Sequence, residues 1–207
     1  MKRLLIIGAS GHGKVVADIA KLNGYDNIAF LDDDESVKEC VGYPVLGKSL
    51  DAEALNASEA SDFFVAIGNS TIRKRIMEGL EAKHLHIITL IHPDAVIAEN
   101  VHISTGSVIM AGVVINSSSS IGSGCIINTS SSVDHDNKIA DYTHVSVGAH
   151  LAGTVTVGEH SWIGVGAVIS NNLTICDHVT IGAGAVVIKN ITIPGTYVGV
   201  PAVRIDK

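Results

Sequence analysis

The sequence of 207 residues has few aromatic side chains, which make up 4% of it, and contains only three cysteines and four prolines. Cys40, Cys125 and Cys176 are widely spaced and form neither a CxxC pair nor a disulfide framework. No window holds about 18 consecutive apolar residues, which argues against a membrane-spanning helix. The longest uncharged stretch, 103–133, is interrupted by Ser, Thr, Asn and Gly. We therefore expect a folded, cytoplasmic protein with reduced cysteines.

Basic residues are also scarce. The chain has 14 Lys and Arg against 21 Asp and Glu, a formal net charge of −7, and Arg73-Lys74-Arg75 is the only basic cluster. A face that binds a polyanion needs clustered Lys and Arg, so the composition argues against nucleic acid as a partner. Any phosphate must be bound by a local site.

Aliphatic residues and glycine are abundant instead: 46% of the chain is hydrophobic and 21 residues are glycine. From Ile91 to Val187, every sixth residue is Ile, Val or Leu without exception, and the position four residues later is mostly small or β-branched. A period of six fits neither a helix nor separate hairpins, and it predicts a parallel β-helix with three short strands in each 18-residue coil. The narrow interior of such a prism explains the shortage of aromatic rings. We assign it to residues 91–207, including a tail from Ile193 that breaks the period.

Residues 1–90 have a different pattern. Apolar strand-like runs at 3–8, 28–31 and 63–68 alternate with helical spacing at 13–22 and 71–83. Asn69-Ser70 can cap the last of these helices, and a further helix is expected near Ser49. The alternation predicts a small Rossmann-like parallel sheet. The expected fold class is therefore α/β followed by all-β.

Two motifs of the first domain favour a nucleotide. The glycines of Gly8-x-x-Gly11-x-Gly13 lie between a strand and a helix, where backbone N–H groups and the helix N-terminus can receive an anion. Asp32-Asp33 follows the next strand, where an acidic group can meet ribose or base. Taken alone, the glycines also fit a tight turn without a ligand, and the aspartates a solvated loop.

His135 is the strongest catalytic candidate. It lies between Asp134 and Asp136 in a turn of an otherwise sparsely charged prism, and a carboxylate there can orient the ring and raise its basicity. By spacing alone, a single exposed histidine is more often just a surface residue.

At this point the sequence resembles a known family. The hexapeptides resemble those of left-handed β-helix acyltransferases, and the joined glycine motif resembles that of sialic acid acetyltransferase-type sugar acetyltransferases. Further motifs closely resemble bacterial UDP-N-acetylbacillosamine N-acetyltransferases, nearly end to end: Phe30-Leu31-Asp32-Asp33, Ala66-Ile67-Gly68-Asn69, Asn128-Thr129-Ser130-Ser131, Val133-Asp134-His135-Asp136, His144-Val145-Ser146-Val147-Gly148-Ala149 and Val198-Gly199-Val200-Pro201-Ala202.

The resemblance implies a left-handed β-helix, a homotrimer with active sites between subunits, and transfer of acetyl from acetyl-CoA to the 4-amino group of a UDP-linked 4-amino-4,6-dideoxy sugar, without a metal. It implies that the sugar nucleotide is bound by Ser10, Gly11, His12, Gly13, Asp32, Asp33, Gly68 and Asn128. It implies that the catalytic residues are the base His135, its carboxylate Asp136, where the family usually has glutamate, and the oxyanion donor Gly153. Asp134 could share the carboxylate's role. The implied acetyl-CoA contacts are His144, Val165 and Ala183, although His144 could equally be a corner side chain packed on Trp162.

Several alternatives stay open at this stage. The same architecture serves sialic acid O-acetylation and GDP-perosamine N-acetylation. A γ-class carbonic anhydrase-like zinc enzyme would need three converging ligands, which His135, His144 and His150 could supply only if the coils brought them together. A non-catalytic sugar-nucleotide-binding subunit would keep the glycine motif but would not need His135.

Overall fold

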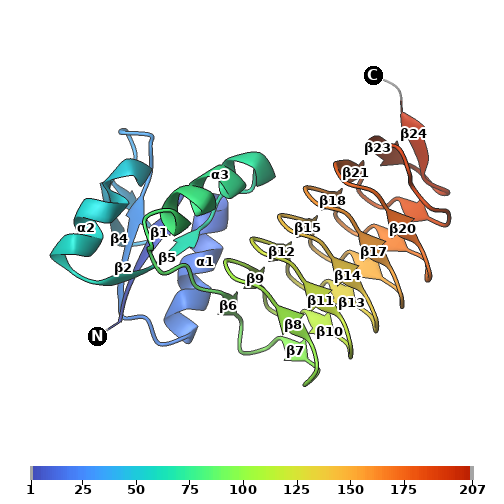
Figure 1. The fold of residues 1–207 in the computed structure, drawn as a ribbon, viewed down its shortest axis with the longest axis horizontal. Coiled ribbons are helices and arrows are strands. Elements are labelled where there is room, and N and C mark those ends of the chain that lie inside the picture. Colours follow the sequence, from blue (N-terminus) through green and yellow to red (C-terminus); the bar gives the residue numbers. More distant parts are fainter. Residues whose placement is uncertain (1, 206–207) are drawn as a thin grey trace. The chain divides into compact units, whose positions relative to one another are not determined.

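The computed structural model describes residues 2–205 (Figure 1). The chain divides into two compact units, the first ending at His92 and the second beginning at Pro93. The expected boundary was at residue 90. No helix within residues 2–205 has both the length and the apolar character that crossing a membrane requires.

The first unit is built on a five-stranded sheet with the order β3-β4-β2-β1-β5. Its strands are β1 (Arg3–Ile7), β2 (Asn27–Leu31), β3 (Glu39–Cys40), β4 (Tyr43–Gly47) and β5 (Ser61–Val65). Its helices are α1 (Gly11–Leu22), the 3₁₀ turn η1 (Ser49–Asp51), α2 (Ala52–Ser58) and α3 (Ser70–Glu81), and a short strand β6 (Leu90–Ile91) follows. Strands β2, β1 and β5 are parallel, as the alternation of strands and helices predicts.

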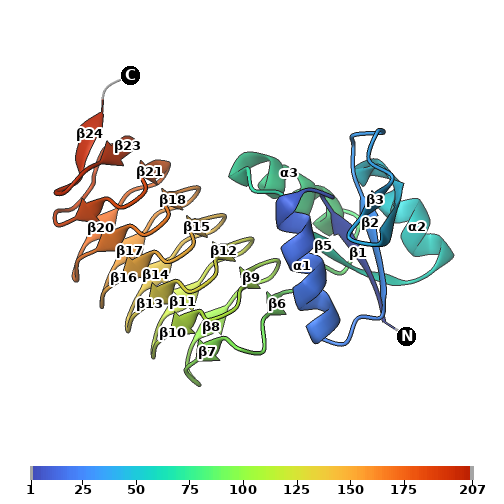
Figure 2. The ribbon, with the colours of Figure 1, turned by 180° about the vertical axis from the view of Figure 1, so that it is seen from behind.

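Burial explains why the central strands are apolar throughout. Every residue of β1 is buried, because helices cover both faces of the sheet: α2 and α3 lie side by side on one face, where Glu53 pairs with Lys83 at 3.1 Å, and α1 lies on the other (Figures 1 and 2). Three of the few aromatic residues, Phe30, Phe63 and Phe64, fill this core at 0–1% exposure. Asn69 caps α3 by accepting the Ile72 N–H at 2.9 Å.

The sequence pattern did not predict β3 and β4. Strand β4 pairs with β2 in parallel, while β3 turns back antiparallel at the sheet edge. Residues of β4 alternate between half-buried and exposed, and Pro44 lies within the strand. An edge strand of this kind has neither an apolar run nor a clean alternation, so its pairing depends on the neighbouring strand.

The second unit is a parallel β-helix in which strands of two or three residues stack coil on coil (Figure 1). Its first face holds β7 (Val96–Ile97), β10 (Val114–Ile115), β13 (Ser132–Val133), β16 (His150–Leu151), β19 (Val168–Ile169) and β22 (Val186–Val187). Its second face holds β8 (His102–Ile103), β11 (Ser120–Ile121), β14 (Lys138–Ile139), β17 (Thr156–Val157) and β20 (Thr174–Ile175). Its third face holds β9 (Val108–Ile109), β12 (Ile126–Ile127), β15 (His144–Val145), β18 (Trp162–Ile163) and β21 (Val179–Ile181).

The six-residue repeat forms the interior of this prism. Strand partners are 18 residues apart, as in Ile127 with Val145 and Val145 with Ile163, and all three side chains are fully buried. At the end of the prism, β23 (Gly195–Val198) continues the third face, and β24 (Val203–Ile205) folds back antiparallel on it. The break in the period at Ile193 therefore marks the end of the coils.

Three corners connect the faces, and each repeats a left-handed backbone position with φ between 56 and 72°. The first corner holds Gly106, Gly124, Tyr142, His160 and His178; the second holds Gly112, Ser130, Gly148, Gly166 and Gly184; and the third holds Ser118, Asp136, Thr154 and Asn172. At the first corner, the rings of Tyr142, His160 and His178 stack at centroid distances of 5.3 and 5.1 Å.

Candidate active site

The glycine turn of the first unit joins β1 to α1, and Asp32 from the end of β2 is bound to it. One Asp32 oxygen, Oδ2, accepts the Ala9 N–H at 2.7 Å, and the other accepts the Asp34 N–H at 2.9 Å. A Cβ added at Gly13 would overlap the carbonyl oxygen of Gly8 and lie 3.1 Å from Phe30. Glycine is thus required where the first turn of α1 packs against the loop. The structure brings the predicted residues Ser10 to Gly13 and Asp32 together.

Gly68 and His12 meet around a buried arginine. Arg73 is 1% exposed, and its Nη1 donates to the carbonyls of Ile67 at 2.6 Å and Gly68 at 2.9 Å. Burial, followed by the nearby Arg73 charge, lowers the pKa of His12 to about 4. The Nε2 atom of His12 is buried and has no hydrogen-bond partner among residues 2–205. The ring is therefore neutral near pH 7, and its Nε2 is an unpaired polar atom beneath the loop.

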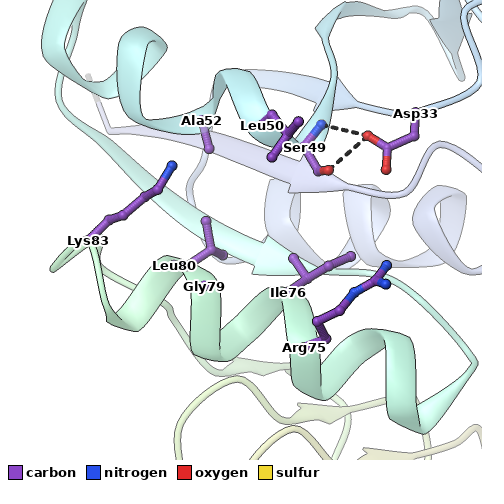
Figure 3. Close-up of a pocket in the computed structure, with 9 residues that line it drawn as sticks. All are labelled: Asp33, Ser49, Leu50, Ala52, Arg75, Ile76, Gly79, Leu80 and Lys83. Carbon is purple, nitrogen blue, oxygen red and sulfur yellow. Dashed lines mark hydrogen bonds between the residues drawn. The ribbon is translucent and has the colours of Figure 1, made fainter.

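Asp33 lies at the edge of a cleft of about 400 Å³ between η1 and α3 (Figure 3). Its Oδ1 accepts both the N–H of Ser49 at 2.9 Å and the hydroxyl of Ser49 at 2.8 Å. These hydrogen bonds hold the pKa of Asp33 below its usual value, and the bond from the Ser49 backbone has the larger effect. Arg75 and Lys83 line the same cleft beside an apolar wall that includes Leu80.

In the second unit, His135 precedes the left-handed residue Asp136 at the third corner. Its Nδ1 lies 2.7 Å from Oδ2 of Asp136, so the shorter carboxylate does reach the ring. This hydrogen bond raises the pKa of His135. Asp134 has a different contact: its Oδ1 accepts the backbone N–H of His135 at 2.8 Å and the amide of Asn116, also at 2.8 Å. Asp136 therefore orients the imidazole ring, and Asp134 holds the backbone of the turn.

The His135 ring packs against Gly153, one coil further along the third corner. A Cβ built on Gly153 would lie 2.5 Å from both Cε1 and Nε2 of His135. Only glycine leaves room for the ring in this position. No hydrogen bond from the Gly153 N–H to another group is found within residues 2–205.

His144 begins β15 on the third face. Its Nε2 lies 3.1 Å from Nδ2 of Asn128, and its ring stacks on Trp162 with centroids 5.1 Å apart. The Trp162 indole N–H donates to the Ser146 hydroxyl at 2.6 Å. His144 therefore packs on Trp162, as one of the two interpretations predicted. Its contact with acetyl-CoA stays a prediction. Val165 and Ala183 are exposed in successive coils at the second corner.

Within each unit, the predicted residues therefore gather into groups. Sequence reasoning missed Arg73, because it read as part of an exposed basic cluster. Asn116 was missed too, and the signal that could have found it is its place 18 residues before Asp134, where coils stack. In the described residues 2–205, no three His, Cys, Asp or Glu side chains form a group that could hold a metal ion.

Both units match known protein families. Residues 3–80 match the PglD N-terminal domain, and residues 154–189 match the bacterial transferase hexapeptide family of six repeats. A curated relative, UDP-N-acetylbacillosamine N-acetyltransferase from Bacillus subtilis (strain 168), is 36% identical over 115 residues. That alignment covers 53% of this chain and 52% of the relative, so it spans about half the length of each.

Solved structures extend the similarity along the whole chain. The acetyltransferase domain of PglB from Neisseria gonorrhoeae FA1090, in complex with acetyl coenzyme A, is 41% identical with a TM-score of 0.94 and covers 99% of each chain. A histidine-to-asparagine mutant of perosamine N-acetyltransferase from Caulobacter crescentus, in complex with CoA and GDP-perosamine, is 34% identical with a TM-score of 0.95. It covers 100% of this chain and 98% of that one.

The expected fold class, a Rossmann-like parallel sheet followed by a left-handed parallel β-helix, is confirmed. The expected resemblance to sugar acetyltransferases is confirmed by the same matches. With these relatives and this arrangement of residues, the chain belongs to the family of acetyl-CoA-dependent sugar N-acetyltransferases that join a PglD-type N-terminal domain to a hexapeptide-repeat β-helix.

Proposed function

We propose that this protein transfers the acetyl group of acetyl-CoA to the 4-amino group of a UDP-linked 4-amino-4,6-dideoxy-N-acetylhexosamine. The observation that carries the proposal is the third corner: His135 is oriented by Asp136 at 2.7 Å, and its ring packs against Gly153. The choice of a UDP-sugar follows the similarity to the Bacillus subtilis enzyme.

Catalysis is proposed to begin at Nε2 of His135. Because Nδ1 is bonded to Asp136, Nε2 is the ring nitrogen left to take a proton from the sugar amine as it attacks the thioester carbonyl. The Gly153 N–H stabilises the oxyanion of the tetrahedral intermediate. The C–S bond then breaks, and the proton held by His135 passes to the departing CoA sulfur. No acyl-enzyme forms, and no metal takes part.

The first unit is proposed to bind the nucleotide. Backbone N–H groups of Ser10 to Gly13 at the start of α1 suit the diphosphate. His12 supports this turn from within the fold, and Arg73 holds the Gly68 carbonyl in the neighbouring loop. Asp32 shapes the loop, Asp33 meets the nucleoside, and Asn128 of the second unit contacts the sugar.

We infer that the active enzyme is a homotrimer in the cytoplasm. In one copy, the proposed acetyl-CoA residues Val165 and Ala183 lie at the second corner and His135 lies at the third, with the first face between them. A neighbouring copy could bring its second corner, with the nearby His144, to the third corner of the first. Val96 and Val168, which are 64% and 40% exposed, are apolar side chains on the first face that such packing would cover.

The decisive assay measures release of the CoA thiol with three acceptors: UDP-4-amino-4,6-dideoxy-GlcNAc, GDP-perosamine and free sialic acid. We expect the UDP-sugar to have the highest kcat/KM. Preference for GDP-perosamine would favour the activity of the Caulobacter crescentus relative, and preference for sialic acid would indicate O-acetylation. No turnover with any acceptor would contradict the enzyme assignment and favour a non-catalytic binding subunit.

His135→Ala tests the proposed base. We expect kcat to fall at least about 100-fold, while the fold persists because the side chain is 57% exposed. Near-wild-type kcat would remove His135 from the mechanism.

Co-expression of two inactive variants, His135→Ala and Ala183→Trp, tests the trimer. A mixed assembly regains intact sites only if the second corner, with Ala183, and the third corner, with His135, come from different subunits.

A further inference from the structure

Asn137 is a fully buried polar residue that directly follows the His135–Asp136 pair. It belongs to an interior ladder of hydrogen bonds formed by inward-facing small polar residues. In this ladder, a hydroxyl donates to the carbonyl 15 residues ahead and accepts the N–H 18 residues ahead. Ser107 is typical: its Oγ donates to the Gly122 carbonyl at 2.7 Å and accepts the Cys125 N–H at 2.9 Å.

Asn137 makes these two hydrogen bonds and further ones within its own coil, including a contact of 3.5 Å from its Nδ2 to the His135 carbonyl. Its Nδ2 donates to the Ala152 carbonyl at 3.1 Å, and its Oδ1 accepts the Val155 N–H at 2.9 Å. Its Nδ2 also donates to the Asp134 carbonyl at 2.6 Å, in the turn of its own coil. A hydroxyl has a single hydrogen to donate, whereas an amide has two. Asn137 can therefore donate to two carbonyls at once.

The two carbonyls belong to the two catalytic turns. Asp134 immediately precedes His135, and Ala152 immediately precedes Gly153. The same ladder column has Ser119 one coil earlier, whose Oγ donates to the Asp134 carbonyl at 2.6 Å. The Asn137 side chain thus hydrogen-bonds to both the turn that holds His135 and the turn that holds Gly153.

We propose that Asn137 is a positioning residue for acetyl transfer: it fixes the separation between the imidazole of His135 and the N–H of Gly153. This inference rests on the proposed function of that site. Both groups must act on one tetrahedral intermediate, and a misplacement of about 1 Å can cost about 100-fold in rate. Asn137 touches neither substrate, because it is enclosed in the prism.

Asn137→Ser tests the proposal, because serine keeps the ladder found in other coils but loses the second donor. We expect kcat to fall about tenfold, since a shift smaller than 1 Å should cost less than the loss cited above. The KM values for acetyl-CoA and the sugar nucleotide should change less than about twofold, because uniform binding is untouched. The matched control is Ser107→Ala, which removes two buried hydrogen bonds at the first corner. It should lower the melting temperature at least as much as Asn137→Ser and leave kcat unchanged.

A double-mutant cycle makes the readout specific. If Asn137 acts through His135, adding Asn137→Ser to His135→Ala should change the residual rate less than about twofold. An Asn137→Ser enzyme with wild-type kcat, or one whose loss persists in full without His135, would overturn the proposal.

Amide hydrogen exchange supplies a readout that needs no turnover. We expect faster exchange in the turns at 134–136 and 152–154 for Asn137→Ser than for Ser107→Ala, and unchanged exchange there would also overturn the proposal. If the wild-type protein acetylates no acceptor, the proposed function fails, whereas the exchange result still reports on whether Asn137 couples the two turns.

Discussion

The two units of this chain present functional groups in different ways. In the first unit, chemistry-bearing residues lie in loops at the ends of long buried strands, and each loop has its own conformation. In the second unit, the same corner conformation recurs every 18 residues, and the proposed base simply occupies one of its positions. The first unit thus depends on particular loops, whereas the second depends on regular stacking. The following predictions test that contrast.

The largest effect is expected from breaking a coil. Ile163 is fully buried and pairs with Val145 and Ile181 in the adjacent coils. Ile163→Ala should lower the free energy of unfolding by about 2–5 kcal/mol, because it leaves a cavity in a narrow core. Thr174→Ala, on the exposed second face, is the control and should have little effect. Denaturant unfolding of both variants measures the difference; equal values would mean that the coils do not depend on their interior.

The next effect tests the loop of the first unit. Gly13→Ala places a methyl group against the Gly8 carbonyl, so the start of α1 must shift. A local strain of about 1–3 kcal/mol corresponds to roughly a tenfold or larger change in binding. We expect KM for the sugar nucleotide to rise by about that factor, with KM for acetyl-CoA unchanged. Lys21→Ala, an exposed position in the last turn of the same helix, is the control. A parallel rise in both KM values would contradict separate binding roles for the units.

A smaller effect concerns the charge at the third corner. His135 must be deprotonated to act as a base, and its hydrogen bond to Asp136 raises its pKa. Asp136→Asn should therefore move the acidic limb of the kcat/KM profile to lower pH, and the weaker base should reduce kcat by roughly tenfold. Asp134→Asn retains an oxygen to accept the His135 N–H and should shift this limb less. A shift toward higher pH in Asp136→Asn would exclude the assigned contact.

The smallest effect is expected on the third face. Trp162 stacks on His144 and donates to Ser146. If His144 contacts acetyl-CoA, Trp162→Leu should raise KM for acetyl-CoA by roughly fivefold, since a stacked pair contributes about 0.5–1.5 kcal/mol, and should leave KM for the sugar nucleotide unchanged. Unchanged KM for both substrates would indicate that the stack is only structural.

The contrast also explains how much the sequence could predict. The coils were predictable because each buried aliphatic residue must recur at the same place in a stacked repeat. The central strands β1, β2 and β5 were predictable because they are buried on both sides. Strands β3 and β4 were not, because β3 has only two residues and the residues of β4 around Pro44 have no distinctive pattern.

For the candidate site, the sequence could indicate residue types but not their division of roles. The pattern Asp134-His135-Asp136 left open which carboxylate supports the ring. The structure separates the two roles, because Asp134 accepts the backbone N–H of His135, whereas Asp136 lies against Nδ1 of its ring. Arg73 and Asn137 were missed for a related reason: their importance comes from carbonyl groups that lie beside them only after folding.

The recurring left-handed corner makes this architecture adaptable. Asp136 occupies a backbone position that Ser118, Thr154 and Asn172 share in other coils, with φ between 58 and 63°. A change of side chain at such a position alters the chemistry of a turn without remodelling the chain, since the neighbouring coils already hold the backbone. Each of these turns is therefore a ready scaffold, on which evolution or a protein engineer could build a new catalytic pair by substitution alone.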